Sequence, residues 1–167
     1  MGATGGGEAA ERPPPGDDLD RAWMARALEM ARAGEVRGEV PVGAVIVRDG
    51  VLLAESHNRT VERRDPTAHA ESLAIRAGAR RLGDWRLSGC TLYTTLEPCA
   101  QCAGAIVLAR ISRLVFGAYD PKGGMAGSLE NLVQDPRLNH RVELLGGVLG
   151  EESSRLLRGF FRARRGG

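Results

Sequence analysis

Residues 91–117 read TLYTTLEPCAQCAGAIVLARISRLVFG, and this stretch decides the fold. The apolar runs Thr91–Leu96 and Arg113–Gly117 each predict a strand, and Cys99–Ala109 predicts a helix between them. Parallel strands need a long crossover of this kind, because a short turn joins only antiparallel strands. The stretch therefore predicts a parallel pair of strands in a sheet covered by helices.

The patterns on either side extend this crossover into an α/β domain. Asp49-Gly50 lies between two short apolar runs and is a strong signal for a β-hairpin. The other expected elements are a helix at Leu19–Ala33, strands at Val42–Val47 and Val51–Glu55, a helix at Ala68–Arg80, a short helix at Ser128–Gln134, a strand at Val142–Leu145 and a helix at Glu151–Arg164. The order αββαβαβαβα predicts a three-layer α/β/α sandwich with a five-stranded mixed sheet.

The composition is typical of one globular domain preceded by a polar leader. Of the 167 residues, 43% are hydrophobic and 26% are charged. Residues 1–18 consist mainly of glycine, alanine, proline and charged residues, so we expect a disordered leader before a domain at 19–165. The N-terminus lacks an apolar signal core, and no stretch approaches the length of a membrane span. We therefore expect a cytoplasmic protein with no membrane partner.

Two short segments carry side chains that ligate zinc. His69 stands two residues before Glu71, and Pro98 introduces the pair Cys99 and Cys102. Imidazole and two thiolates are ligands that zinc prefers, and three protein ligands leave its fourth tetrahedral position open, as in catalytic sites. His-x-Glu followed by Pro-Cys-x-x-Cys is the signature of zinc-dependent base deaminases. The sequence predicts one Zn²⁺ per chain, held by His69, Cys99 and Cys102.

Glu71 is not needed as a ligand and is therefore the predicted acid/base. Two thiolates cancel the charge of the ion, so a nearby carboxylate is needed to take the proton of the attacking water. Residues at i and i+2 of a helix point to different sides. The side chains of His69 and Glu71 can therefore reach the same metal only if it lies near the end of the helix. Thr67 is the expected cap of that helix.

The cysteine pair has two other interpretations. A lone Cys-x-x-Cys also occurs in redox pairs and in structural zinc sites. A redox pair leaves His69-x-Glu71 unexplained, and a structural site requires a fourth cysteine or histidine. Cys90 precedes an apolar strand and is the expected small core residue, while His57 and His140 lie in unremarkable contexts.

Arginines gather near the C-terminus, although the net charge of the chain is only +2. Such runs are usually solvated helix faces, but beside a base-modifying site they also suit a phosphate backbone. The basic residues of the tail are Arg155, Arg158, Arg162, Arg164 and Arg165, and further pairs stand at Arg63-Arg64 and Arg80-Arg81.

Beyond the zinc motif, the chain resembles the bacterial tRNA-specific adenosine deaminases of the cytidine deaminase-like superfamily. The resemblance runs from about Leu19 to Arg165. It is carried by Glu39–Val45, Asn58-Arg59, Asp65–Glu71, Leu92–Cys99, Cys102–Ala105, Val115–Ala118, Gly127–Leu129, Asn139–Val142 and Phe160–Arg162. It implies hydrolytic deamination of adenosine to inosine at the wobble position of a tRNA anticodon, carried out by a homodimer.

The resemblance also implies roles for individual residues. His69, Cys99 and Cys102 take the zinc positions, and Glu71 takes the position of the proton shuttle. Asn58 matches the asparagine that hydrogen-bonds the target base. Asp120 matches an aspartate that lies against the anticodon-loop backbone, with Lys122 close by.

Two residues depart from the family pattern. Gln101 stands between the cysteines, where the family usually has methionine, and its place beside the metal predicts altered packing or altered dimer contacts. Tyr119 stands where some relatives carry arginine. An aromatic ring there either stacks on an anticodon base or packs against the protein.

Two competing functions remain open from the sequence. The first is a deaminase of a free base or nucleoside, such as guanine or cytosine, on the same scaffold; such an enzyme has no need of the basic tail or the Asp120 loop. The second is a non-catalytic zinc protein that binds RNA. Glu71 argues against the second, because a structural zinc site has no use for an unligated carboxylate.

Overall fold

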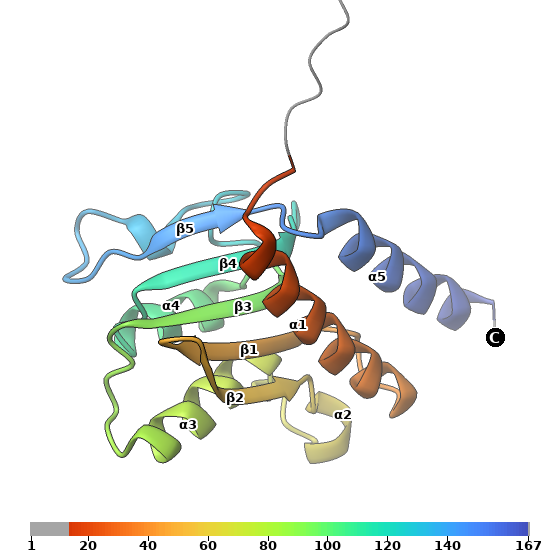
Figure 1. The fold of residues 1–167 in the computed structure, drawn as a ribbon. Helices are drawn as coiled ribbons and strands as arrows, with labels where there is room; N and C mark the ends of the chain where they lie inside the picture. Colours follow the sequence, from red (N-terminus) through yellow and green to blue (C-terminus); the bar gives the residue numbers. More distant parts are fainter. Residues whose placement is uncertain (1–13, 167) are drawn as a thin grey trace, which may run out of the picture.

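The computed structural model describes residues 14–166, which form a mixed sheet flanked by helices (Figure 1). The helices are α1 (Asp18–Val36), α2 (Thr60–Arg63), α3 (Ala70–Leu82), α4 (Ala100–Leu108) and α5 (Gly150–Arg165), with a single 3₁₀ turn at Leu132–Gln134. The strands are β1 (Gly43–Arg48), β2 (Val51–His57), β3 (Cys90–Leu96), β4 (Arg113–Ala118) and β5 (Glu143–Gly146).

The five strands are ordered β2-β1-β3-β4-β5. β1 runs antiparallel to β2 and to β3, whereas β3–β4 and β4–β5 are parallel pairs. The parallel register places Leu92 opposite Leu114, with α4 as the crossover. The predicted mixed sheet and its parallel crossover are confirmed.

Alternating side chains of the central strands fill two separate cores, one on each face of the sheet. Ile46, Leu92 and Leu114 belong to the core on the side of α3 and α4. Their neighbours Val45 and Tyr93 belong to the core beneath α1. In Figure 1, α1 crosses in front of the sheet while α3 and α4 lie behind it. These layers confirm the predicted three-layer α/β/α sandwich.

Helix α1 begins inside the segment predicted as a leader. The Asp17 carboxylate accepts the N–H of Asp20, and the Asp20 carboxylate accepts the N–H of Asp17, which is a capping box. Arg21 also donates to the carbonyl of Gly16 at 2.6 Å. The rest of the predicted leader, residues 1–13, lies outside the described residues. Within 14–166, every helix is too short or too polar to cross a membrane.

One local expectation was wrong, and one short element was not predicted. The segment Ser128–Gln134 is not a helix: only its last three residues form a 3₁₀ turn. The N–H and the hydroxyl of Ser128 both bind the Glu97 carboxylate, which holds this part of the segment in a turn. The second difference is α2, which the sequence did not predict because four residues are too few to show a helical period.

Candidate active site

The predicted metal ligands lie at the starts of two helices. His69 is the N-cap residue of α3 and Cys99 is the N-cap residue of α4, and both have extended backbone. Since His69 precedes the first helical turn, its side chain and that of Glu71 turn toward the same space, which meets the requirement drawn from their spacing. The helix of Cys99 follows the carboxyl end of β3, where ligands bind in open α/β sheets.

Thr67 does not cap α3. Its N–H and its hydroxyl both donate to the Asp65 carboxylate, at 2.8 and 2.6 Å. The N–H of Ala70, the first residue of α3, donates instead to Oδ1 of Asn58 at 2.9 Å. Asn58 therefore binds the start of the helix that carries Glu71.

His69, Cys99 and Cys102 converge on one point. Their ligand atoms all lie within 4.8 Å of one another, and among residues 14–166 this is the one such group of metal-ligating side chains. His69 Nδ1 is 3.5 Å from the Sγ atom of each cysteine. Zinc–sulfur and zinc–nitrogen bonds of usual length at a tetrahedral angle give an edge of about 3.5 Å. The geometry and the donor set therefore fit a zinc ion.

Hydrogen bonds within this group act on the cysteine thiols. The contact with Cys102, followed by the contact with His69, lowers the pKa of Cys99 below its ordinary value. Thiolate is the form that binds a metal. Cys99 is thus suited to bind a cation as its thiolate.

Glu71 is buried beside this group. Its Oε1 accepts the Thr94 hydroxyl at 3.0 Å, from the middle of the sheet. Burial raises the pKa of Glu71 above its ordinary value, because desolvation disfavours the charged carboxylate. A carboxyl group with a raised pKa is suited to accept and return a proton near neutral pH.

A cavity of about 260 Å³, the catalytic pocket, opens over these residues. Asn58, Glu71 and Asp120 all lie on its wall, so the structure brings these three predicted site residues together. Because Asn58 Oδ1 already accepts the N–H of Ala70, its Nδ2 amide group is left to donate. The complete lining is Val40, Val42, Asn58, Thr60, His69, Glu71, Leu96, Glu97, Cys99 and Asp120.

Asp120 is set in place by its own loop and by Glu97. The Asp120 side chain accepts the N–H groups of Lys122 and Gly123, at 3.0 and 3.2 Å. Its backbone N–H donates to the Glu97 carboxylate at 3.0 Å. A turn of this kind is the structure expected for an aspartate without any role in binding, so the local geometry alone does not assign one.

Glu97 is a buried carboxylate to which the sequence analysis gave no role. It accepts the N–H groups of Ala126 and Ser128 in addition to that of Asp120. Burial alone would raise its pKa, but these hydrogen bonds, with that of the Ser128 hydroxyl, lower the pKa of Glu97. A Cβ atom on Gly124 would overlap this carboxylate, so only glycine fits there. A signal was present in the sequence: a glutamate at the end of an apolar strand, directly before Pro98-Cys99.

A second cavity of about 700 Å³, the outer groove, adjoins the catalytic pocket and shares Val40, Leu96 and Asp120 with it. Lys122 lies here and not in the catalytic pocket. Tyr119 is 58% exposed and also packs its ring edge-on against Phe116, at 4.8 Å between centroids. The residues that line the outer groove alone are Tyr119, Lys122, Leu157, Arg158, Phe161, Arg164 and Arg165.

Gln101, between the two cysteines, hydrogen-bonds to the segment that contains His69. Its Nε2 donates to the Thr67 carbonyl at 2.9 Å and to the Ser72 hydroxyl at 3.2 Å. The same hydroxyl lies 3.4 Å from Cys102 Sγ. Cys90 is a buried core residue, as predicted, and His57 and His140 lie outside the catalytic pocket and bind backbone carbonyls.

Comparison with known proteins agrees with this geometry. Residues 19–165 match the family model of the MafB19-like deaminases. The chain is 49% identical over 146 residues to the tRNA-specific adenosine deaminase of Bacillus subtilis strain 168, which is 87% of this chain and 91% of that protein.

Two solved structures share the fold. A deaminase from work on A-to-I editing by tRNA A34 deaminases at the wobble position superposes with a TM-score of 0.79 at 47% identity, covering 81% of this chain and 99% of that one. The guanine deaminase of Nitrosomonas europaea superposes with a TM-score of 0.75 at 26% identity, over 90% of this chain and 88% of that one. The chain therefore belongs to the MafB19-like deaminases and, among them, to the tRNA-specific adenosine deaminases.

Proposed function

We propose that this protein catalyses the hydrolytic deamination of adenosine to inosine at the wobble position of a tRNA anticodon. The observation that carries the proposal is a buried carboxylate, Glu71, next to one nitrogen and two sulfur ligands in an open pocket. The identity to tRNA-specific adenosine deaminases supports adenosine in tRNA as the substrate.

One zinc ion per chain, held by His69, Cys99 and Cys102, is part of the proposal. The ligand set and the edges of 3.5 Å support zinc over metals that prefer oxygen ligands. When bound, zinc would make water a nucleophile at neutral pH by lowering the pKa of that water.

Glu71 moves the protons of the reaction in this proposal. Water adds to C6 of adenine and the exocyclic amine leaves as ammonia, so a proton must pass from the water to the departing nitrogen. The raised pKa of Glu71 suits it to both transfers. The Thr94 hydroxyl holds the carboxylate from the side of the sheet, so the carboxylate enters the pocket in a fixed orientation.

Asn58 orients the base in this proposal. Its Nδ2 group is the donor left over after Oδ1 binds the N–H of Ala70, and Asn58 lies on the wall of the pocket. An amide donor in that position suits an acceptor nitrogen of a purine. The same Asn58 side chain binds the start of α3, the helix that carries Glu71. It would therefore hold the base in a fixed position relative to the proton shuttle.

The outer groove supports a polynucleotide substrate over a free base. It carries an exposed aromatic ring, Tyr119, and cations from two elements, Lys122 and Arg158. Bases stack on aromatic rings, and phosphates bind lysine and arginine. The groove and Asp120 together suit the anticodon loop, which presents an unpaired base and so avoids most of the cost of base flipping.

A homodimer in the cytoplasm, where tRNA is found, completes the proposal. Ala100, Gly104 and Leu108 lie four residues apart on one face of α4, and Leu108 is 70% exposed. A partner subunit that packs there would lie beside the helix of Cys102. Light scattering of the native protein and of Leu108→Asp tests this: the native protein should be dimeric, and a monomeric native protein would contradict the proposal.

Inosine formation across a panel of substrates tests the proposed function. The purified protein should convert the wobble adenosine of a tRNA stem-loop and leave free adenosine, guanine and cytosine unchanged, with Glu71→Ala as the inactive control. A stem-loop that carries guanosine at the same position should not react. Efficient turnover of a free base without any turnover of tRNA would favour the alternative, a free-base deaminase.

A further inference from the structure

Helix α2 forms part of the rim of the catalytic pocket and has little to hold it in place. It is four residues long, Thr60–Arg63, and none of its side chains is buried. A helix this short does not form on its own, because nucleation is not repaid by enough hydrogen bonds. Thr60 nevertheless lines the catalytic pocket, two residues after Asn58.

The cap of α2 comes from a distant part of the chain. The residue at the N-cap position, Arg59, makes no side-chain capping bond. The Glu39 carboxylate instead accepts the N–H of Val61 at 3.2 Å and the N–H of Glu62 at 2.8 Å. These are the two N–H groups that an ordinary N-cap side chain would bind.

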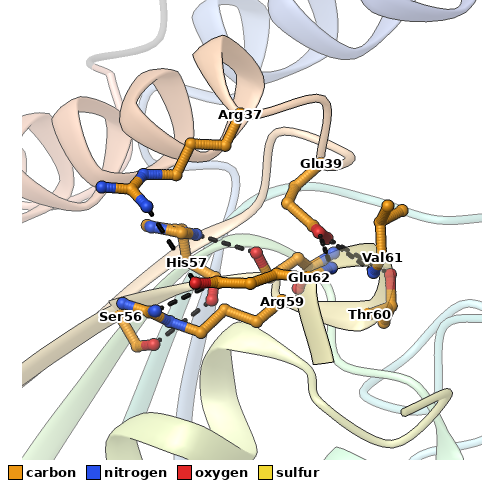
Figure 2. Close-up of polar contacts among 9 residues, drawn as sticks. Arg37, Glu39, Ser56, His57, Arg59, Thr60, Val61 and Glu62 are labelled. Atoms are coloured by element: carbon orange, nitrogen blue, oxygen red, sulfur yellow. Dashed lines mark hydrogen bonds and ion pairs between the residues drawn. The ribbon is translucent and has the colours of Figure 1, made fainter. Parts of the chain in front are cut away.

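Figure 2 shows that the Glu39 carboxylate meets the first turn of α2 at close range. It also accepts the Thr60 hydroxyl at 3.3 Å. Glu39 therefore provides three of the hydrogen bonds that hold the first turn of α2.

Glu39 is itself held firmly. It is completely buried, and its backbone N–H donates to the Gly34 carbonyl at the end of α1 at 3.0 Å. The preceding carbonyl, that of Gly38, accepts a hydrogen bond of 2.6 Å from Arg164 of α5. The following residue, Val40, lines the catalytic pocket. Glu39 thus joins one wall of the pocket to the rim segment 58–60.

We propose that Glu39 is a positioning residue for deamination: by capping α2 it fixes segment 58–60, and with it the Asn58 amide that binds the base. The upstream side of this segment is held by backbone bonds, Asn58 N–H to the Val42 carbonyl and Arg59 N–H to the Ala68 carbonyl. On the downstream side the Asp65 N–H donates to the Thr60 carbonyl at 3.1 Å, and the Glu39 carboxylate is the buried side chain that binds the first turn of α2. The inference rests on the proposed role of Asn58.

Glu39→Gln and Glu39→Ala test the inference against Asp20→Asn, which also alters a buried carboxylate of the α1 region but lies away from the pocket. In Glu39→Gln an amide group faces two N–H donors, so at least one of them loses its acceptor. We expect kcat on a tRNA stem-loop to fall on the order of 10- to 100-fold, because small misplacements of reacting groups cost this much. KM should change little, since the RNA contacts proposed above lie mainly in the outer groove, and Asp20→Asn should retain wild-type kcat.

Hydrogen exchange of the α2 amides gives a second readout. Protection of at least one of the Val61 and Glu62 amides should be lost in Glu39→Gln, and protection of both should be kept in Asp20→Asn, while zinc content stays at the wild-type level in both. Retained protection of both amides in Glu39→Gln would overturn the inference, whatever the activity.

A double-mutant cycle separates this inference from the role of Asn58. If Glu39 acts through Asn58, the kcat losses of Glu39→Gln and Asn58→Ala are not additive. Additive losses, or wild-type kcat in Glu39→Gln beside an inactive Asn58→Ala, would overturn the inference and leave the role of Asn58 intact. Wild-type kcat in Asn58→Ala would remove the role of Asn58 and the inference together.

Discussion

Asp20 and Glu71 are buried carboxylates on opposite faces of the same sheet, and their surroundings differ sharply. Consecutive residues of β3 reach them: Tyr93 donates to Asp20 at 2.8 Å on the face of α1, and Thr94 donates to Glu71 at 3.0 Å on the face of α3. The Asp20 carboxylate also accepts hydrogen bonds from both terminal nitrogens of the Arg113 guanidinium, at 2.6 and 2.9 Å. Glu71 has no cationic partner of this kind among the residues described.

The difference separates a structural carboxylate from the one proposed as the proton shuttle. The hydrogen bonds from Arg113 outweigh burial and lower the pKa of Asp20. Burial dominates at Glu71 and raises its pKa. A carboxylate that is fully paired fixes its charge and its neighbours, whereas one left with few partners can change its protonation state during a reaction. Four predictions test this contrast, in order of decreasing effect on turnover.

The largest effect is expected on removal of the metal ligands. The double variant Cys99→Ala/Cys102→Ala should bind no stoichiometric zinc and show no detectable deamination, because one of three ligands remains. Metal analysis and inosine assays measure both quantities. The single variant Cys90→Ala is the matched control, since Cys90 is a buried cysteine outside the site. Full zinc retention in the double variant would contradict the assigned ligands.

Glu71→Ala should retain zinc and fold but lose on the order of 10²–10⁴ in kcat, the usual contribution of a general acid/base group. Zinc content, circular dichroism and single-turnover inosine formation are the measurements. A variant within about tenfold of wild type would mean that another group moves the proton.

A smaller effect is expected in the outer groove. Replacing Arg158 and Arg165, which line this groove, with glutamine should weaken tRNA binding and flatten its salt dependence by about one unit of slope for each lost phosphate contact. Arg164 is left in place because it also binds the Gly38 carbonyl. Arg76→Gln/Arg80→Gln, on α3 and outside the groove, is the control. An unchanged salt slope in the α5 variant would mean that this helix does not meet phosphates.

Asp20→Asn should leave kcat unchanged and reduce stability instead. Tyr93 and Arg113 both donate to the Asp20 carboxylate and lose this charged acceptor in the variant. The loss should lower the free energy of unfolding by about 1–3 kcal/mol. A chain of this length should melt several degrees lower, at about 2–4 °C per kcal/mol. Thermal melts and inosine assays at 25 °C give both values. A loss of turnover without a loss of stability would reverse the roles assigned to the two carboxylates.

The pH dependence of stability sharpens the same prediction. The folded-state pKa of Asp20 lies below its ordinary value of 3.8, so its contribution is present above about pH 4. That contribution is lost as the pH falls through 3.8 toward the lower folded-state pKa, where the unfolded chain binds the extra proton. Urea titrations of the wild type should show a steeper loss of stability in this acidic range than those of Asp20→Asn.

Much of the fold was predictable because the elements are locally encoded. The apolar runs predicted all five strands, and the helical patterns predicted the four longer helices. Expectations failed where a distant group decides the local structure. Ser128 is drawn into a turn by Glu97, and the start of α3 is bound by Asn58 where Thr67 was expected.

The convergence of His69, Cys99 and Cys102 was also predictable, because zinc chemistry limits the residue types and the spacing within each motif. The roles proposed for Asn58, Asp120 and Lys122 came from resemblance to a family, and the structure places the first two on the pocket and the third in the outer groove. The sequence pattern alone assigned no role to Thr94 or Glu39, since neither belongs to a metal-binding motif.

The succession of strands and longer helices along the chain, and the residues with the chemistry for a deaminase, could be read from the sequence. Both depend on periodicity and ligand type, which are properties of short segments. The surroundings of each buried carboxylate depend on how the whole chain folds. Asp20 meets Arg113 across 93 positions, Glu39 meets Glu62 across 23, and Glu97 meets Ser128 across 31. A carboxylate becomes structural or reactive according to the donors that folding brings to it, and no local pattern records those donors.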